Sequence, residues 1–191
     1  MLRAIITSLF IYGGAANLEI FTQRFSADPA PLVVEDRVFM YTSHDINDQA
    51  GWLMTDYNCF SSDDLVNWRD EGIVFTIHNQ TWGEYAWAQQ VIFNPHTQLY
   101  TMFYPGMNAR PPPANSATGT GVATSSSPTG PFQDALGHPL LPCGDDPTVF
   151  MDDDGTIVLC GECRVNRNAL LTVCVPVCLP VPHLQLLCLS R

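Results

Sequence analysis

The chain has 191 residues, a formal net charge of −11 and a hydrophobic fraction of 46%. This hydrophobic fraction is sufficient for a packed core, so the chain is not a disordered acidic tail. The negative charge argues against nucleic acid and against an anionic membrane surface as partners, because their phosphate groups repel it.

The first sixteen residues have the layout of a secretory signal peptide. Arg3 precedes an apolar run from Ala4 to Tyr12, and Gly14 and Ala16 are small residues at the positions that signal peptidase requires. The alternative interpretation is a first core strand. The run is too short for a transmembrane helix, which needs about twenty apolar residues. We therefore expect residues 1–16 to be a signal peptide and the protein to be secreted and extracellular.

The body of the chain carries short runs of β-branched and aromatic residues between clusters of Gly, Pro, Asn and Asp. This pattern is typical of β-strands. The clearest runs, in chain order, are 37–41, 72–76, 98–104 and 156–159. No segment keeps a sustained helical period, so we predict an all-β fold.

Three stretches of the chain share one layout, which is a short apolar strand, a turn and a second strand. They begin at Asp28, Ala88 and Asp146, so the steps between them are 60 and 58 residues. A period of this size fits one four-stranded blade of a β-propeller, and the body of the chain would hold about three blades of an incomplete ring. Chance similarity between hairpins is the alternative explanation of the spacing alone.

Four stretches of the sequence follow one another in a recognisable order, namely 27–31 with 37–45, 59–72, 86–92, and 121–132 with 145–155. Together they resemble glycoside hydrolase family 43. The resemblance implies a β-propeller of the five-bladed type that hydrolyses O-glycosyl bonds of arabinose-, xylose- or galactose-containing polysaccharides by inversion. It also implies an oligo- or polysaccharide partner, no cofactor and a monomer.

The resemblance assigns roles to two aspartates that each precede a proline. Asp28 matches the general base, and Asp146 matches the carboxylate that modulates the pKa of the general acid. In an inverting glycosidase the base activates a water while the acid protonates the leaving oxygen. The alternative for each aspartate is an ordinary Asp-Pro turn.

The general acid of the family, a glutamate well downstream of the second aspartate, is not identified in this sequence. The only glutamate after Asp146 is Glu162, which directly follows the third hairpin. The sequence therefore keeps two function classes open. One is a glycoside hydrolase, and the other is a catalytically inactive fragment that at most binds carbohydrate weakly.

Three further residues are candidates for sugar contacts. Trp87 offers an aromatic face of the kind that packs against sugar C–H groups, although it could equally be an aromatic packed inside a blade. His44 and Asp45 follow the first hairpin and could hydrogen-bond sugar hydroxyls. A solvated loop is the alternative for these two residues.

The composition changes at about residue 161. Five of the seven cysteines lie at or after Cys160, while residues 163–191 contain no Asp or Glu. The odd cysteine count leaves at least one thiol unpaired, and the spacing gives no clear zinc pattern, so we predict no metal site. We therefore divide the chain into the signal peptide, a partial propeller domain over residues 17–161, and a Cys- and Pro-rich tail outside the family over residues 162–191.

Overall fold

The structure is a computed structural model that describes residues 24–45, 54–79, 82–83, 85–107, 119–166 and 169–177. The predicted signal peptide lies outside these residues. Within the described part, the regular structure is β-strand except for one 3-10 turn, η3 (Ile77–Asn79), so the all-β prediction is confirmed. A search of the same residues finds no helix with the length and apolar character needed to cross a bilayer.

The first sheet is a four-stranded antiparallel meander. Its strands pair in chain order, and the third of them is buried along almost its whole length. The strands are β1 (Ser26–Val34), β2 (Arg37–Asp45), β3 (Met54–Ser62) and β4 (Arg69–Thr76).

The second sheet repeats this meander with a divided first strand. Both β5 and β6 pair with β7, so together they form the two halves of one strand, and β8 and β9 follow outward. The strands are β5 (Tyr85–Ala86), β6 (Gln90–Asn94), β7 (Leu99–Met107), β8 (Gly119–Ser125) and β9 (Gln133–Asp134).

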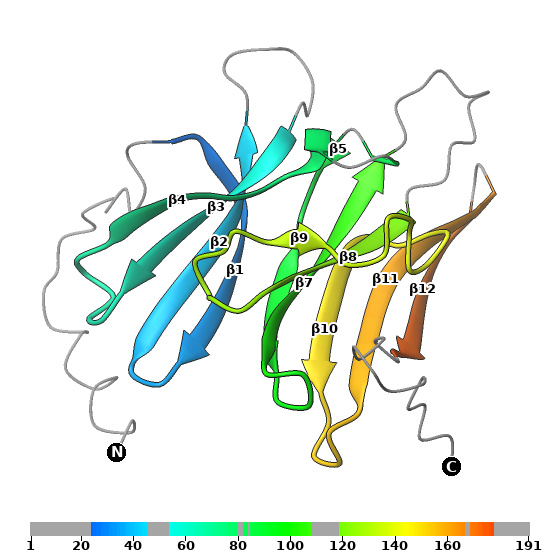
Figure 1. Cartoon of the computed structure of the whole chain (residues 1–191). Coiled ribbons are helices and arrows are strands. Elements are labelled where there is room, and N and C mark those ends of the chain that lie inside the picture. The colour runs from blue at the N-terminus through cyan, green and yellow to red at the C-terminus, as the bar shows by residue number, and fades with distance from the viewer. Residues whose placement is uncertain are drawn as a thin grey trace, which may run out of the picture.

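The third sheet contains β10 (Asp145–Met151), β11 (Ile157–Asn166) and β12 (Ala169–Pro176). The three sheets stand side by side in chain order (Figure 1), and β6 contacts both β1 and β10. The prediction of about three propeller blades is confirmed. Strand pairing continues to Pro176, so the boundary expected at residue 161 falls inside β11.

Two hydrophobic clusters hold neighbouring sheets together. The larger cluster lies between the first and second sheets and includes stacked and tilted aromatic rings, while the smaller one lies between the second and third. Fully burying one such side chain stabilises the fold by about 1.5–3 kcal/mol. The largest buried side chains of the first cluster are Tyr41, Tyr57, Phe75 and Tyr104, and the second contains Phe103, Val122, Val149, Ile157 and Leu159.

Two glycines leave room for an aromatic pair in the second sheet. Trp82 stacks on Tyr104 with ring centroids 5.7 Å apart. A Cβ at Gly106 would lie 2.4 Å from the Trp82 ring, and a Cβ at Gly121 would lie 2.4 Å from the Tyr104 ring. Any side chain at either position would therefore displace the aromatic pair.

Candidate active site

The innermost strand of each sheet carries one extra residue near its start. Between the pairs Ala27↔Ser43 and Ala30↔Tyr41, β1 advances three residues while β2 advances two. In β10 the same offset lies between Asp145↔Glu162 and Thr148↔Cys160. Bulges of this kind change the direction in which a side chain projects and are common beside active sites.

Both predicted catalytic aspartates occupy these bulges. Asp28 has a φ of 51° and Asp146 a φ of 44°, so both adopt the left-handed conformation that non-glycine residues usually avoid. Such strain costs about 1–3 kcal/mol and is most often retained at functional sites. The structure therefore gives the two Asp-Pro pairs the same local geometry in the first and third sheets, and both aspartates are exposed.

The Asp28 carboxylate is oriented by its own hairpin. The Ser43 hydroxyl, which is fully buried, donates a hydrogen bond of 2.8 Å to Oδ2 of Asp28. Ser43 pairs with Ala27 across β1 and β2, so the register of the hairpin places the donor beside the bulge. This bond fixes one carboxylate oxygen while the exposed side chain remains within reach of solvent.

Tyr57 of β3 lies in the aromatic core between the first and second sheets. Burial raises the pKa of this phenol well above its usual value, and interactions with Tyr104 and with the carboxylates of Asp28 and Asp145 raise it further. Since the phenol stays protonated, it donates a 2.7 Å hydrogen bond to the Trp87 carbonyl.

Trp87 lies in the three-residue break between β5 and β6, and its side chain is half-buried. The break is the counterpart in the second sheet of the two aspartate bulges. Between the pairs Ala86↔Gly106 and Gln90↔Phe103, the inner strand advances four residues against three. The structure therefore places Trp87 at the same end of its blade as Asp28 and Asp146.

His44 and Asp45 end β2, so neither lies in the loop that was the alternative interpretation. The His44 Nδ1 atom lies 2.6 Å from Oδ1 of Asp56 on β3, and the two side chains are 25% and 13% exposed. Asp56 fixes the orientation of the ring. The position of His44 opposite Ser26 in the β1–β2 register places it next to the Asp28 bulge.

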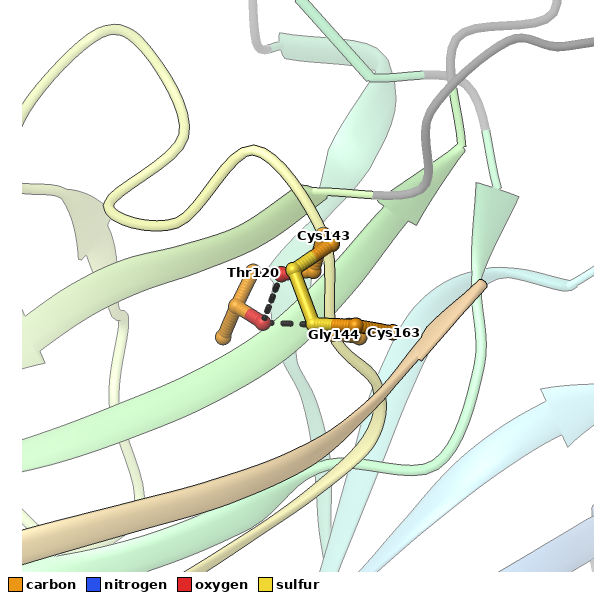
Figure 2. Close-up of a disulfide and its surroundings, with 4 residues drawn as sticks. All are labelled: Thr120, Cys143, Gly144 and Cys163. Carbon is orange, nitrogen blue, oxygen red and sulfur yellow. Dashed lines mark hydrogen bonds between the residues drawn. A yellow bond between two sulfur atoms is a disulfide. The ribbon is translucent and has the colours of Figure 1, made fainter. Parts of the chain in front are cut away.

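The segment that leads into Asp146 is held by a disulfide and a threonine. Figure 2 shows Cys143 bonded to Cys163 on β11, with Thr120 of β8 beside them. The Thr120 hydroxyl is within hydrogen-bonding distance of two carbonyl oxygens, 3.1 Å from that of Cys143 and 3.0 Å from that of Gly144. Both contacts fix the backbone directly before β10.

A second disulfide joins Cys160 to Cys174, which are cross-strand partners on β11 and β12. The described part of the chain thus uses four cysteines in two disulfides and keeps Cys59 as a buried thiol. The structure groups no three metal-ligating side chains within its described ranges.

Comparison with known proteins identifies the family. The family model for glycosyl hydrolases family 43 matches residues 20–169. The chain belongs to this family. The match extends past residue 161 and so includes all of β11 and the first residue of β12.

Similar family members include curated enzymes from bacteria. An arabinoxylan arabinofuranohydrolase of Bacillus subtilis is 29% identical over 168 residues, which cover 72% of this chain and 31% of that protein. A xylosidase/arabinosidase of Bacteroides ovatus is 30% identical over 141 residues, covering 69% of this chain and 41% of that protein. The chain thus spans less than half the length of these two relatives.

Solved structures show the same fold. A β-xylosidase/α-arabinofuranosidase from a compost metagenome matches with a TM-score of 0.64 and 27% identity, over 74% of this chain and 43% of that chain. An α-L-arabinofuranosidase from Clostridium thermocellum matches with a TM-score of 0.59 and 33% identity, over 81% of this chain and 53% of that chain. The three sheets are therefore part of a family 43 propeller.

Sequence reasoning did not single out three residues that shape the site. Ser43 orients Asp28, Asp56 orients His44, and Tyr57 connects the first sheet to Trp87. All three lie on β2 or β3, one or two strands away from the innermost strand. Their side chains become site residues only through cross-strand register, although the run from His44 to Tyr57 is rich enough in polar groups to have drawn attention.

Proposed function

We propose that the site at the starts of β1 and β10 activates water for inverting hydrolysis of glycosidic bonds, with Asp28 as the general base. The observation that supports this most is the pair of matched bulges that hold Asp28 and Asp146 in the same left-handed conformation. The substrates are arabinose-, xylose- or galactose-containing glycans, as the names of the family 43 relatives suggest for this family.

Each side chain has a role that follows from its contacts. The Asp28 carboxylate, held by Ser43 and open to solvent, would accept a proton from the attacking water. Asp146 would act on the general acid through its charge, because a nearby carboxylate disfavours ionisation of another. Trp87 and His44 would contact the sugar, His44 through Nε2 because Asp56 occupies Nδ1.

One observation favours a second candidate, a carbohydrate-binding chain without turnover. Glu162, the only glutamate after Asp146, is the cross-strand partner of Asp145. It therefore lies on the same blade as the proposed pKa modulator. The general acid of the family lies well downstream of that aspartate, so we assign Glu162 no role as acid. Without an acid, only substrates whose leaving group departs unprotonated would turn over.

Leaving-group dependence separates the two candidates. We expect release of 2,4-dinitrophenol from aryl arabinofuranosides or xylosides, because this leaving group needs no proton, and little release of methanol from the methyl glycosides. Asp28→Asn should lower the aryl reaction by about 10²–10⁴-fold. Asp36→Asn, an exposed aspartate in the β1–β2 turn, is the matched control and should leave the rate unchanged.

The product configuration, followed by proton NMR, should be inverted at the anomeric carbon. No turnover together with sugar-induced NMR shifts at Trp87 and His44 would favour the binding chain. If the chain shows no turnover and no sugar-induced shifts, both candidates are refuted.

A further inference from the structure

Gln90 links the second sheet to the third directly beside Asp146. Its side-chain carbonyl oxygen accepts two hydrogen bonds from β10, one of 2.7 Å from the Thr148 hydroxyl and one of 2.8 Å from the Val149 backbone N–H. A carbonyl oxygen has two lone pairs, so these two bonds use its full capacity.

The backbone of β10 needs such a partner. Among the residues that the structure describes, this strand pairs only with β11, along one edge, so the N–H groups of its other edge have no strand there to accept them. Val149 is 3% exposed, and a buried N–H without a partner costs about 1–3 kcal/mol. Gln90 thus supplies from a side chain what a neighbouring strand supplies elsewhere in the sheet.

The two ends of this contact occupy corresponding places in their blades. Gln90 is the first residue of β6 after the break that holds Trp87, and Thr148 is the first paired residue of β10 after the bulge that holds Asp146. The contact therefore joins the strands at the points where each resumes regular pairing.

We propose that Gln90 is a positioning residue that sets where Asp146 stands relative to the first sheet. The β6 strand contacts β1 as well as β10, so it is the element through which the two aspartate-bearing strands are kept in register with each other. Thr148 and Val149 follow Asp146 by two and three residues. Pro147, which lies between Asp146 and Thr148, restricts the backbone. A displacement of Thr148 would thus move Asp146 with it. The functional part of this inference rests on the role proposed for Asp146.

The test uses the full chain, labelled with ¹⁵N and ¹³C. Gln90→Leu removes the acceptor at similar volume, and we expect amide exchange of Val149 to accelerate about tenfold or more, because its N–H opens without global unfolding. The ¹³C resonance of the Asp146 carboxyl should shift, while that of Asp28 keeps its position. Gln90→Glu retains an acceptor oxygen, so its Val149 exchange rate and its Asp146 carboxyl resonance should be close to those of the wild type. Gln133→Leu, at an exposed glutamine of β9, is the control.

Unchanged Val149 exchange in Gln90→Leu, or failure of Gln90→Glu to restore it, would overturn the proposal. If Gln90→Leu does not fold, Thr148→Val removes one of the two donors to the same oxygen and should shift the Asp146 carboxyl resonance in the same direction. An unmoved resonance there would count equally against the proposal.

Turnover of the dinitrophenyl glycosides separates this proposal from the proposed function. Where the wild type is active, Gln90→Leu should leave kcat on these glycosides unchanged, because their leaving group needs no proton and Asp146 is proposed to act only on the general acid. Where the wild type is inactive, the proposed function fails, and the exchange and carboxyl signals alone decide whether Gln90 positions Asp146.

Discussion

The first and third sheets carry the same aspartate bulge but are stabilised by different means. The first sheet has four strands and buries Tyr41 and Tyr57 completely against the second sheet. The third has three strands, exposes Phe150 by 51%, and is tied by two disulfides. The same local geometry can therefore be maintained by a large aromatic core in one blade and by covalent links in another.

The largest expected effect is in the first sheet. Tyr41→Ala removes a fully buried ring that packs edge-on against Phe132 and whose hydroxyl donates a 2.6 Å hydrogen bond to the Pro128 carbonyl. We expect the free energy of unfolding to fall by about 3–5 kcal/mol in denaturant titrations. Tyr41→Phe loses only the hydrogen bond and should cost about 0.5–1.5 kcal/mol. Equal losses for both variants would show that the ring contributes nothing beyond its hydroxyl.

The next effect should be confined to the third sheet. Replacing Cys143 and Cys163 by serine removes a bond that closes a loop with a sequence separation of 20. We expect a loss of about 3 kcal/mol, since the unlinked unfolded chain gains entropy. Hydrogen–deuterium exchange should accelerate in peptides of β10 and β11. Cys59→Ser, which touches no disulfide, serves as the reference. If the Cys143/Cys163 double variant instead accelerated exchange in β1–β4, the division between the sheets would be contradicted.

A smaller effect should be the same in both sheets. At Asp28 and at Asp146 a glycine variant should be more stable than the alanine variant by about 1 kcal/mol, because glycine adopts a positive φ without strain. Both variants lose the carboxylate, so the comparison isolates the backbone. Asp36, in the β1–β2 turn, should show the opposite order. Thermal unfolding of the six variants measures this, and a glycine advantage at only one bulge would show that the bulges differ.

The smallest effect is a pH dependence at two exposed turns. Hydrogen bonds from Asn67 and Val66 lower the pKa of Asp64 after the first sheet's third strand, and bonds from Thr156 lower that of Asp154 in the β10–β11 turn. A lowered folded-state pKa stabilises the fold above the unfolded pKa, and this contribution is lost as pH falls through the folded pKa.

Carboxyl ¹³C titration measures both groups. We expect Asp64 to titrate at the lower pH, because it accepts bonds from more donors, and Asn67→Ala to raise its pKa toward the usual 3.8. A titration of Asp154 below that of Asp64 would reverse the comparison.

Much of the fold was predictable because local sequence patterns, namely strand alternation and turn residues, determine it. The predicted runs at 37–41, 72–76, 98–104 and 156–159 fall in β2, β4, β7 and β11; their starts are within one residue except in β4, which begins three residues earlier, at Arg69. The spacing of the three repeats gave the blade count. These features depend on alternation and turn residues, which neighbouring positions in the chain carry by themselves.

The parts that were not predicted depend on contacts across strands. The cysteine pairing follows from β12, whose alternating residues were assigned to a separate tail, and only the β11–β12 register brings Cys160 opposite Cys174. Likewise, the bond from Ser43 to Asp28 follows from a bulge that spacing cannot reveal. The roles of Asp28, Asp146, Trp87, His44 and Asp45 stay predictions, although the structure gathers the first four at corresponding blade ends.

The pairing of Trp82 and Tyr104 with Gly106 and Gly121 has a consequence for sequence variation. Because the rings occupy the volume of the two absent side chains, the four positions form one steric unit. A saturation library would return only glycine at positions 106 and 121 as long as both aromatics remain, and would tolerate alanine there only together with a smaller residue at position 82 or 104. Covariation among homologous sequences should then link these four columns even where the catalytic residues are invariant.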